Sequence, residues 1–243
     1  MIIKLIVCYD GTNYCGWQIQ KNQISVQQVL EKAIKQITGE TVKVAGSGRT
    51  DAGVHAEGQV CSFETNCNIP PENFAKALNT VLPADVKAVK SQKATENFNA
   101  RKSAKKKTYV YSLYLSQTQN PLKERYASRI DCDLDLEKMI KASKLLLGKH
   151  DFVAFSSVGS SVKTTVREIY DLSIDKTGED IKISVTGNGF LYNMVRIIVG
   201  TLVKAGKGDI EEKEIEKMLN GGNRALGGAT MPAKGLCLKE VCY

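Results

Sequence analysis

Twelve consecutive residues, Ala45–Ala56, combine three glycines with one carboxylate, one guanidinium and one imidazole. The carboxylate is Asp51, the guanidinium is Arg49 and the imidazole is His55. Glycines allow backbone angles that other residues avoid, and they let a partner approach the main chain closely. Such a loop can present an ionised carboxylate that acts as a nucleophile or a base. It can equally be a solvated surface turn, so the rest of the chain has to decide.

A second chemical feature is a guanidinium inside an apolar segment. Arg196 lies within residues 190–203, which are apolar around most of a helical circumference. A buried arginine needs an anionic partner, because an unpaired charge is costly to bury. Asp51 is one candidate for that partner. The alternative is that Arg196 lies on a polar stripe of the helix and faces solvent.

A basic stretch leads directly into an aromatic strand. Residues 101–107 contain five cations, among them Arg101, Lys105, Lys106 and Lys107. Tyr109 and Tyr111 follow, and alternate residues of a strand lie on the same face. Lysines that hold phosphates beside an aromatic ring that stacks on a base are typical of nucleic-acid binding. The alternatives are a solvated linker and, for at least one tyrosine, packing in the core.

Composition narrows the classes of protein. The 243 residues carry a net charge of +8, which favours an anionic partner. Seven cysteines without a C-x-x-C pair, and only two histidines, argue against a zinc site or a disulfide framework. We therefore expect reduced thiols, no metal and a cytoplasmic location. We also expect no membrane association, because residues 190–203 are too short to span a bilayer, and residues 1–10 resemble a strand rather than a signal peptide.

The expected elements repeat one order. Apolar periodicity and turn residues predict a β-α-β-β-α-β order in the first half and a β-α-β-β-α-α-β order in the second. Ser25 and Gln28 resemble a capping box at the start of the first helix. We expect strands at residues 2–10, 41–45, 59–65, 85–89, 107–115, 165–174, 180–186 and 236–241, and helices at about 26–38, 70–81, 136–147, 190–204 and 210–219.

This order predicts an α+β fold made of two ferredoxin-like halves, whose largely antiparallel sheets abut to form a central cleft. The polar, lysine-rich span at residues 95–105 is the natural boundary. The N-terminal half, residues 1–100, carries the loop with Asp51. The C-terminal half, residues 101–243, carries the basic strand and the apolar helix with Arg196. No repeat of individual residues accompanies the repeat of elements.

The sequence resembles the TruA family of tRNA pseudouridine synthases over essentially its whole length. An ordered set of motifs carries the resemblance, and it is far more specific than any one of them. In chain order the motifs are Y-D-G-T at 9–12, G-W-Q at 16–18, G-R-T-D-A-G-V-H at 48–55, F-N-A-R at 98–101, K-T-Y-V-Y at 107–111, H-D-F at 150–152, F-L-Y-N-M-V-R at 190–196 and G-L-C-L at 235–238.

The resemblance implies an enzyme that isomerises uridine to pseudouridine at positions 38, 39 and 40 of the tRNA anticodon stem-loop. It implies a homodimer that uses neither metal nor organic cofactor. Asp51 matches the catalytic aspartate, and Tyr109 matches the tyrosine that contacts the target base. Arg196 matches the arginine that pairs with the aspartate, and Arg49 matches one that helps to hold the flipped nucleotide. Short connections such as residues 117–125 put peripheral tRNA contacts in doubt, but not the chemistry.

The reaction breaks the N1–C1′ bond, rotates the uracil and rejoins it through C5. We expect Asp51 to be ionised, with Arg196 and Arg49 favouring its charged form, and to attack C1′ or C6 or take the 2′ proton. We expect Arg101 and Lys105–Lys107 to hold the RNA backbone. Two alternatives remain at this point: a non-catalytic RNA-binding module, and a phosphate cradle, although the loop lacks the G-x-x-x-x-G-K-[ST] pattern. We expect the histidines to be structural.

Overall fold

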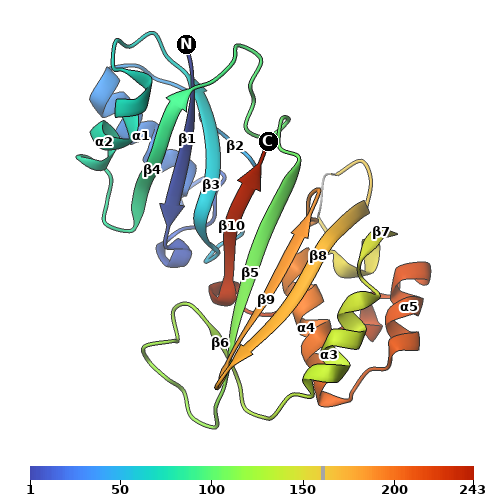
Figure 1. Ribbon diagram of the computed structural model, residues 1–243. Helices are drawn as coiled ribbons and strands as arrows, with labels where there is room; N and C mark the ends of the chain where they lie inside the picture. Colours follow the sequence, from blue (N-terminus) through green and yellow to red (C-terminus); the bar gives the residue numbers. More distant parts are fainter. Residues whose placement is uncertain (160–161) are drawn as a thin grey trace. The chain divides into compact units, whose positions relative to one another are not determined.

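The computed structural model describes residues 1–159 and 162–243 and contains two compact units (Figure 1). Unit 1 comprises residues 1–105 and 237–243, and unit 2 comprises residues 106–236. Each unit is a mixed α/β structure in which the strands pair mostly antiparallel. The predicted mixed architecture with antiparallel sheets is therefore confirmed. The ferredoxin-like assignment, the central cleft and the boundary at residue 100 stay predictions.

The sheet of unit 1 follows the order β4-β1-β3-β10, with the short strand β2 also paired to β3. Strand β10 runs parallel to β3, and the other pairs are antiparallel. The strands are β1 (Ile2–Tyr9), β2 (Ala45–Gly46), β3 (His55–Glu64), β4 (Val86–Lys93) and β10 (Leu236–Cys242).

Two helices complete unit 1. Helix α1 (Val26–Thr38) begins at Ser25, whose side chain accepts a hydrogen bond from the Gln28 amide. Helix α2 (Phe74–Asn79) follows a single 3-10 turn, so the predicted helix at 70–81 divides into two short pieces. Alternate residues of β1 are fully buried and form the core together with the apolar face of α1.

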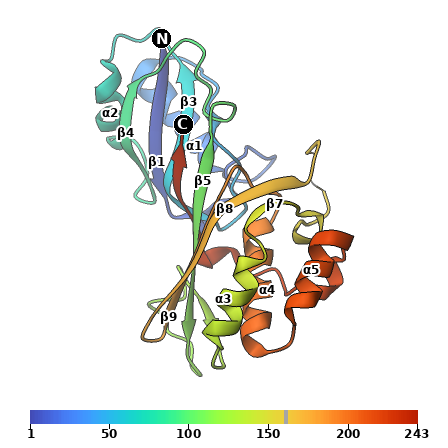
Figure 2. The ribbon, with the colours of Figure 1, turned by 45° about the vertical axis from the view of Figure 1, so that its right-hand side comes forward.

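The sheet of unit 2 follows the order β5-β9-β8-β7, and β6 pairs in parallel with β5. Helices α3, α4 and α5 gather on one side of this sheet, as both views of the ribbon show (Figure 2). The elements are β5 (Lys106–Leu115), β6 (Ser128–Ile130), α3 (Leu136–Lys144), β7 (Gly148–Asp151), β8 (Val166–Thr177), β9 (Asp180–Gly187), α4 (Met194–Lys207) and α5 (Glu212–Gly221).

Helix α4 begins at Met194, four residues later than the predicted start at 190. The reason is Asn193, which precedes the helix in a left-handed conformation with φ of 61°. This residue turns the chain, because a right-handed helix has no place for that angle. The preceding carbonyl of Tyr192 accepts a hydrogen bond from Ser157 instead of continuing a helix. Arg196 therefore lies in the first turn of α4, where it contacts the segment that contains Met231.

Strand β2 is shorter than the predicted strand at 41–45. The amide of Val44 donates a hydrogen bond to the Glu31 carboxylate at 3.0 Å, so this group is satisfied by a side chain of α1 rather than by a strand. Pairing begins only at Ala45. The local sequence predicted a strand from residue 41, but the hydrogen bond to Glu31 takes up the Val44 amide, and the strand begins only at Ala45.

Strand β3 starts at His55, four residues before the predicted start at 59. Glu57 and Gly58 interrupt the apolar alternation that predicted the strand, yet they lie within β3, directly after the residues that pair with β10. At Gly58 a Cβ atom would lie 2.4 Å from the Lys239 carbonyl oxygen, so only glycine fits this approach.

Strands β6 and β7 were not predicted, because each has only three or four residues and β7 is polar. Helix α3 ends three residues before its predicted end at 147. No helix in the described parts of the chain is long and apolar enough to cross a membrane. All seven cysteines are free thiols.

Candidate functional site

The loop between β2 and β3, residues 47–54, carries Asp51 and is named the Asp51 loop below. Its main chain is fixed at several points. The Ser47 amide donates to the Val60 carbonyl at 2.7 Å, and the Thr50 carbonyl accepts from the Trp17 amide at 3.0 Å. The loop is thus tied to the strand behind it and to the segment that follows β1. Because its backbone is held, the loop presents its side chains from a defined frame.

Buried side chains beneath the loop add further anchors. The Tyr9 hydroxyl and the Thr50 Oγ1 lie 2.8 Å apart and share a hydrogen bond. Tyr9 is buried, and burial raises the pKa of its hydroxyl far above the usual range. It therefore stays a neutral hydrogen-bonding group. The ring of Trp17 packs beside Tyr9 with ring centroids 6.4 Å apart.

Gly16 lies in the segment that follows β1, and this segment packs closely against the Asp51 loop. Gly16 has φ of 104°, and a Cβ atom there would lie 2.4 Å from the Thr50 carbonyl oxygen. A side chain at this position would collide with backbone and not with a movable side chain. The G-W-Q motif therefore lets a second loop approach the residue that precedes Asp51.

Arg49 and Asp51 occupy the same loop two residues apart. Asp51 is half-buried and Arg49 is exposed. The Arg49 Nε donates to the Gln18 Oε1 at 3.3 Å, and the Gln18 amide donates in turn to Gln27 Oε1 at 2.9 Å. The predicted carboxylate and its neighbouring cation are therefore brought together in unit 1.

The histidines are held in structural positions. The Nδ1 atom of His55 accepts a hydrogen bond from the Gly11 amide at 3.0 Å. The Asp10 carboxylate lies 3.2 Å from the same nitrogen, so the imidazole is held against the segment that follows β1. In unit 2 the Nε2 of His150 contacts the Leu147 carbonyl oxygen at 2.7 Å.

In unit 2, Tyr109 and Tyr111 differ despite lying on the same face of β5. Tyr109 is 8% exposed, and its ring packs edge-on against Phe190 with centroids 5.3 Å apart. Tyr111 is fully buried, and its hydroxyl contacts Ser128 Oγ and the Pro232 carbonyl oxygen, each at 2.7 Å. Burial raises the pKa of Tyr111 to about 12. Tyr111 is thus a core residue, whereas Tyr109 retains some access to solvent.

Arg196 is half-buried at the start of α4, and its guanidinium is held by two acceptors. The Nε donates to the Met231 carbonyl oxygen at 2.5 Å, and Nη1 donates to the Asn193 Oδ1 at 2.8 Å. The Asn193 amide donates to Ser157 Oγ at 2.9 Å. The guanidinium is therefore fixed within unit 2 rather than free on a solvated stripe.

The basic stretch is exposed for most of its length. Arg101, Lys105 and Lys106 are exposed, and Lys107 is half-buried in β5. The Asn99 side chain accepts from the Arg101 amide at 3.0 Å, which forms a local turn at the start of the stretch. This arrangement leaves several cationic side chains at the surface.

The predicted site residues divide between the units. Asp51 and Arg49 lie in unit 1, and Tyr109 and Arg196 lie in unit 2. In residues 1–159 and 162–243, no group of three or more His, Cys, Asp or Glu side chains is arranged to hold a metal.

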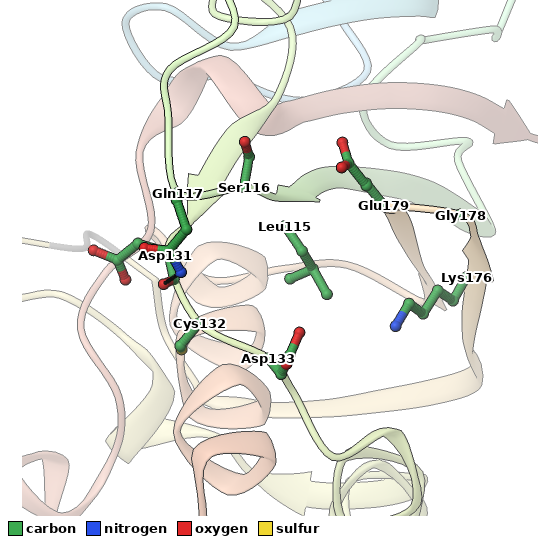
Figure 3. A pocket seen from close by; sticks show the side chains of 9 residues that line it. All are labelled: Leu115, Ser116, Gln117, Asp131, Cys132, Asp133, Lys176, Gly178 and Glu179. Atoms are coloured by element: carbon green, nitrogen blue, oxygen red, sulfur yellow. Dashed lines mark hydrogen bonds between the residues drawn. The ribbon is translucent and has the colours of Figure 1, made fainter.

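A pocket of about 320 Å³ at one end of unit 2 contains none of the predicted site residues (Figure 3). Asp131, Asp133, Glu179 and Lys176 are among the residues that line it, and Figure 3 shows Leu115 between them. Its acidic lining does not suit a polyanion such as RNA. The lining residues are Leu115, Ser116, Gln117, Asp131, Cys132, Asp133, Lys176, Gly178 and Glu179.

The sequence did not predict the groups that hold the site residues. These are above all the side chains of Gln59 and Asn193 and the main-chain carbonyl of Met231. Gln59 lies on β3, only eight residues after Asp51, and it contacts the Asp51 loop. No local sequence pattern predicted this contact. Asn193 stands within a motif that carried the family resemblance, but its left-handed angle was not predicted.

Comparison with known proteins gives a consistent result. A family model described as tRNA pseudouridine synthase matches residues 5–102 and 142–243. The chain is 48% identical over 241 residues to tRNA pseudouridine synthase A of Thermoanaerobacter sp. (strain X514), with 99% of each chain covered. It is 46% identical over 241 residues to tRNA pseudouridine synthase A 2 of Clostridium perfringens (strain 13 / Type A), again with 99% of each covered.

Among solved structures, the chain is similar to one in a crystal structure of a Cbf5-Nop10-Gar1 complex, with a TM-score of 0.42 and 15% identity. That similarity covers 97% of this chain and 57% of the other.

Proposed function

This chain belongs to the tRNA pseudouridine synthase family, and we propose that it converts uridines 38, 39 and 40 of the tRNA anticodon stem-loop, with Asp51 as the catalytic residue. Its relatives at 48% and 46% identity are named tRNA pseudouridine synthases, which are isomerases. This membership decides against the non-catalytic RNA-binding module.

One observation carries the choice of Asp51. It is the half-buried carboxylate on a loop whose main chain is fixed by hydrogen bonds on both sides of Arg49. Isomerisation exchanges an N1–C1′ bond for a C5–C1′ bond and needs no change of oxidation state. Attack at C1′, attack at C6 and removal of the 2′ proton are the three routes open to a carboxylate, and each requires Asp51 in its ionised form.

We assign Arg196 as the partner of the Asp51 carboxylate in the assembled site. Its guanidinium is already oriented by Met231 and Asn193, so little side-chain freedom is lost when an anion binds. A cation beside Asp51 favours its ionised form. Arg49 supports the flipped nucleotide. Its hydrogen bond to Gln18 is long, at 3.3 Å, and therefore weak, so a phosphate oxygen can replace Gln18 as the acceptor.

Tyr109 is assigned the contact with the target base. Extruding a base from its stack costs a few kcal/mol, and stacking on an aromatic ring returns about 1–3 kcal/mol. The edge-on contact with Phe190 supports this role, because it fixes the orientation of the Tyr109 ring. The proposal also includes a homodimer in the cytoplasm, with Arg101, Lys105, Lys106 and Lys107 holding the RNA backbone.

Release of tritium from tRNA labelled at C5 of uridine tests the proposal, because C5 loses its hydrogen when pseudouridine forms. Substrates with uridine at only one of positions 38, 39 and 40 should each release label, and tRNA with cytidine at all three should release none. Asp51→Ala should bind tRNA as the wild type does and release no label. Release by Asp51→Ala, or release from the cytidine control, would contradict the assignment.

A further inference from the structure

We infer that Gln59 is a positioning residue whose buried carboxamide sets the geometry of Arg49 and Asp51 by holding the backbone of the Asp51 loop. The inference rests on the proposed role of Asp51. Gln59 does not reach the substrate in this account. It acts through the main chain that carries the two functional side chains.

The contacts of Gln59 place it at the start of the Asp51 loop. Its Oε1 accepts from the Ser47 hydroxyl at 2.6 Å, and its Nε2 donates to the Gly48 carbonyl oxygen at 3.0 Å. Gln59 and Ser47 are both fully buried. Gln59 pairs with Val7 in the sheet, so its side chain points into the core beneath the loop. Because the amide donates at one end and accepts at the other, its orientation is fixed.

Tyr9 extends this arrangement to the other side of Arg49. Its hydroxyl shares a hydrogen bond with Thr50, the residue directly before Asp51. Burial raises the pKa of the Tyr9 hydroxyl, so the group stays neutral and keeps its hydrogen bond to Thr50. Together the two side chains hold the loop at positions 47, 48 and 50. The residues between and after these anchors are Arg49 and Asp51.

A purely structural residue at this position would be apolar, since burying an amide is costly unless both of its ends are paired. The amide of Gln59 is paired, and both partners belong to the Asp51 loop. An apolar side chain of similar length would leave the Gly48 carbonyl and the Ser47 hydroxyl without Gln59. The loop would then shift, and an error of about 1 Å at a catalytic group can cost on the order of 100-fold in rate.

The first test is Gln59→Met in the full-length protein, with single-turnover tritium release, tRNA dissociation constant and thermal unfolding measured together. We expect the rate on bound tRNA to fall about 10- to 100-fold, while the dissociation constant changes less than about threefold.

Ser91→Ala is the matched control. Ser91 is also buried in unit 1, and its hydroxyl accepts from the Ala75 amide at 2.9 Å, away from the Asp51 loop. It should lower thermal stability and leave the rate on bound tRNA unchanged. Equal losses of rate in Ser91→Ala and Gln59→Met would reduce Gln59 to a structural residue and overturn the inference.

Gln59→Glu provides a readout that a structural role would not move, and it keeps the inference testable if Gln59→Met does not fold. A protonated carboxyl can donate to Gly48 and accept from Ser47 as the amide does, whereas the ionised form cannot donate. Burial raises a carboxyl pKa, so the ratio of mutant to wild-type rate should rise as pH falls from about 8 to about 6. Tyr9 stays neutral over this range.

A ratio that does not change with pH would contradict the inference. So would a wild-type rate for Gln59→Met in a preparation where Asp51→Ala is inactive, and that outcome would leave the proposed function intact. An active Asp51→Ala would instead remove the proposed function itself.

Discussion

The Asp51 loop of unit 1 and the start of α4 in unit 2 hold their functional residues through different contacts. In the loop, hydrogen bonds fix the main chain at Ser47, Gly48 and Thr50, and Gln18 also holds the Arg49 side chain. At the start of α4, the Arg196 guanidinium itself donates hydrogen bonds to the Met231 carbonyl and the Asn193 side chain, which hold it in place.

This difference fits the work proposed for each region. A carboxylate that attacks or deprotonates a substrate must keep its oxygens available, so its position is best fixed through the backbone. A guanidinium that supplies a steady positive charge can be oriented by neutral acceptors, such as the Met231 carbonyl and the Asn193 side chain, because these leave its charge in place. Substitutions of the residues that hold each region, such as Gly16 and Asn193, should therefore change the positions of the functional groups without removing those groups.

Among substitutions of the residues that frame the two regions, the largest effect is expected from Gly16→Ala. A Cβ atom there would lie 2.4 Å from the Thr50 carbonyl oxygen and 3.0 Å from the Asp51 carbonyl carbon. The substitution must move the loop, so we expect single-turnover tritium release to fall by on the order of 100-fold. Gly39→Ala is the control, because Gly39 also has a positive φ of 77° but a Cβ there meets nothing within 4 Å. Equal rates for the two variants would show that loop position is not limiting.

A smaller effect, about tenfold, is expected when Asn193 loses its hold on Arg196, because the Met231 carbonyl still accepts from the guanidinium. Asn193→Gly keeps the left-handed angle but removes the side chain, and Asn193→Ala removes both. We expect the same loss of rate in both variants, with a further loss of about 1 kcal/mol of stability in Asn193→Ala alone. Asn22→Ala, at an exposed residue with the same φ of 61°, controls for backbone strain. A wild-type rate in Asn193→Gly would show that this hydrogen bond does not orient Arg196 for catalysis.

Tyr109→Phe should change the rate and the tRNA affinity by no more than about threefold, since stacking, worth about 1–3 kcal/mol, is kept when the hydroxyl is removed. The edge-on contact with Phe190 is also kept. Tritium release and tRNA binding measured side by side decide the matter. A loss beyond tenfold would assign the hydroxyl a direct part in the reaction.

The smallest effect belongs to the exposed lysines. Lys105→Gln and Lys106→Gln should each reduce the slope of log affinity against log salt by about one, because each removes one phosphate contact. The rate on bound tRNA should not change. Lys32→Gln, at an exposed lysine on α1, should leave the slope as it is. An unchanged slope in all three variants would place the RNA backbone elsewhere.

Much of the fold was predictable because local signals were strong. A run of β-forming apolar residues predicted β1, and Ser25 and Gly39 predicted the two ends of α1. The start of α4 was not predictable from composition, because the apolar run continues through Asn193 and only its left-handed angle breaks the helix.

The candidate site divides in the same way. The glycines around Asp51 and the charge within an apolar helix singled out Asp51 and Arg196. Gln59 was missed, because a glutamine at the end of an alternating strand suggests a solvent-facing residue. Its partners, Ser47 and Gly48, lie 12 and 11 residues away in the sequence, and only the folded sheet brings them into contact with it.

The most direct test of this division of labour is the single-turnover rate of tritium release from preformed tRNA complexes of Asp51→Asn and Arg196→Gln, measured side by side. Asp51→Asn keeps the shape of the side chain without its charge, and it should bind tRNA yet release no label. Arg196→Gln should release label slowly but measurably, because the carboxylate remains. Release by Asp51→Asn at a rate equal to or above that of Arg196→Gln would contradict the assignment of Asp51 as the chemical centre.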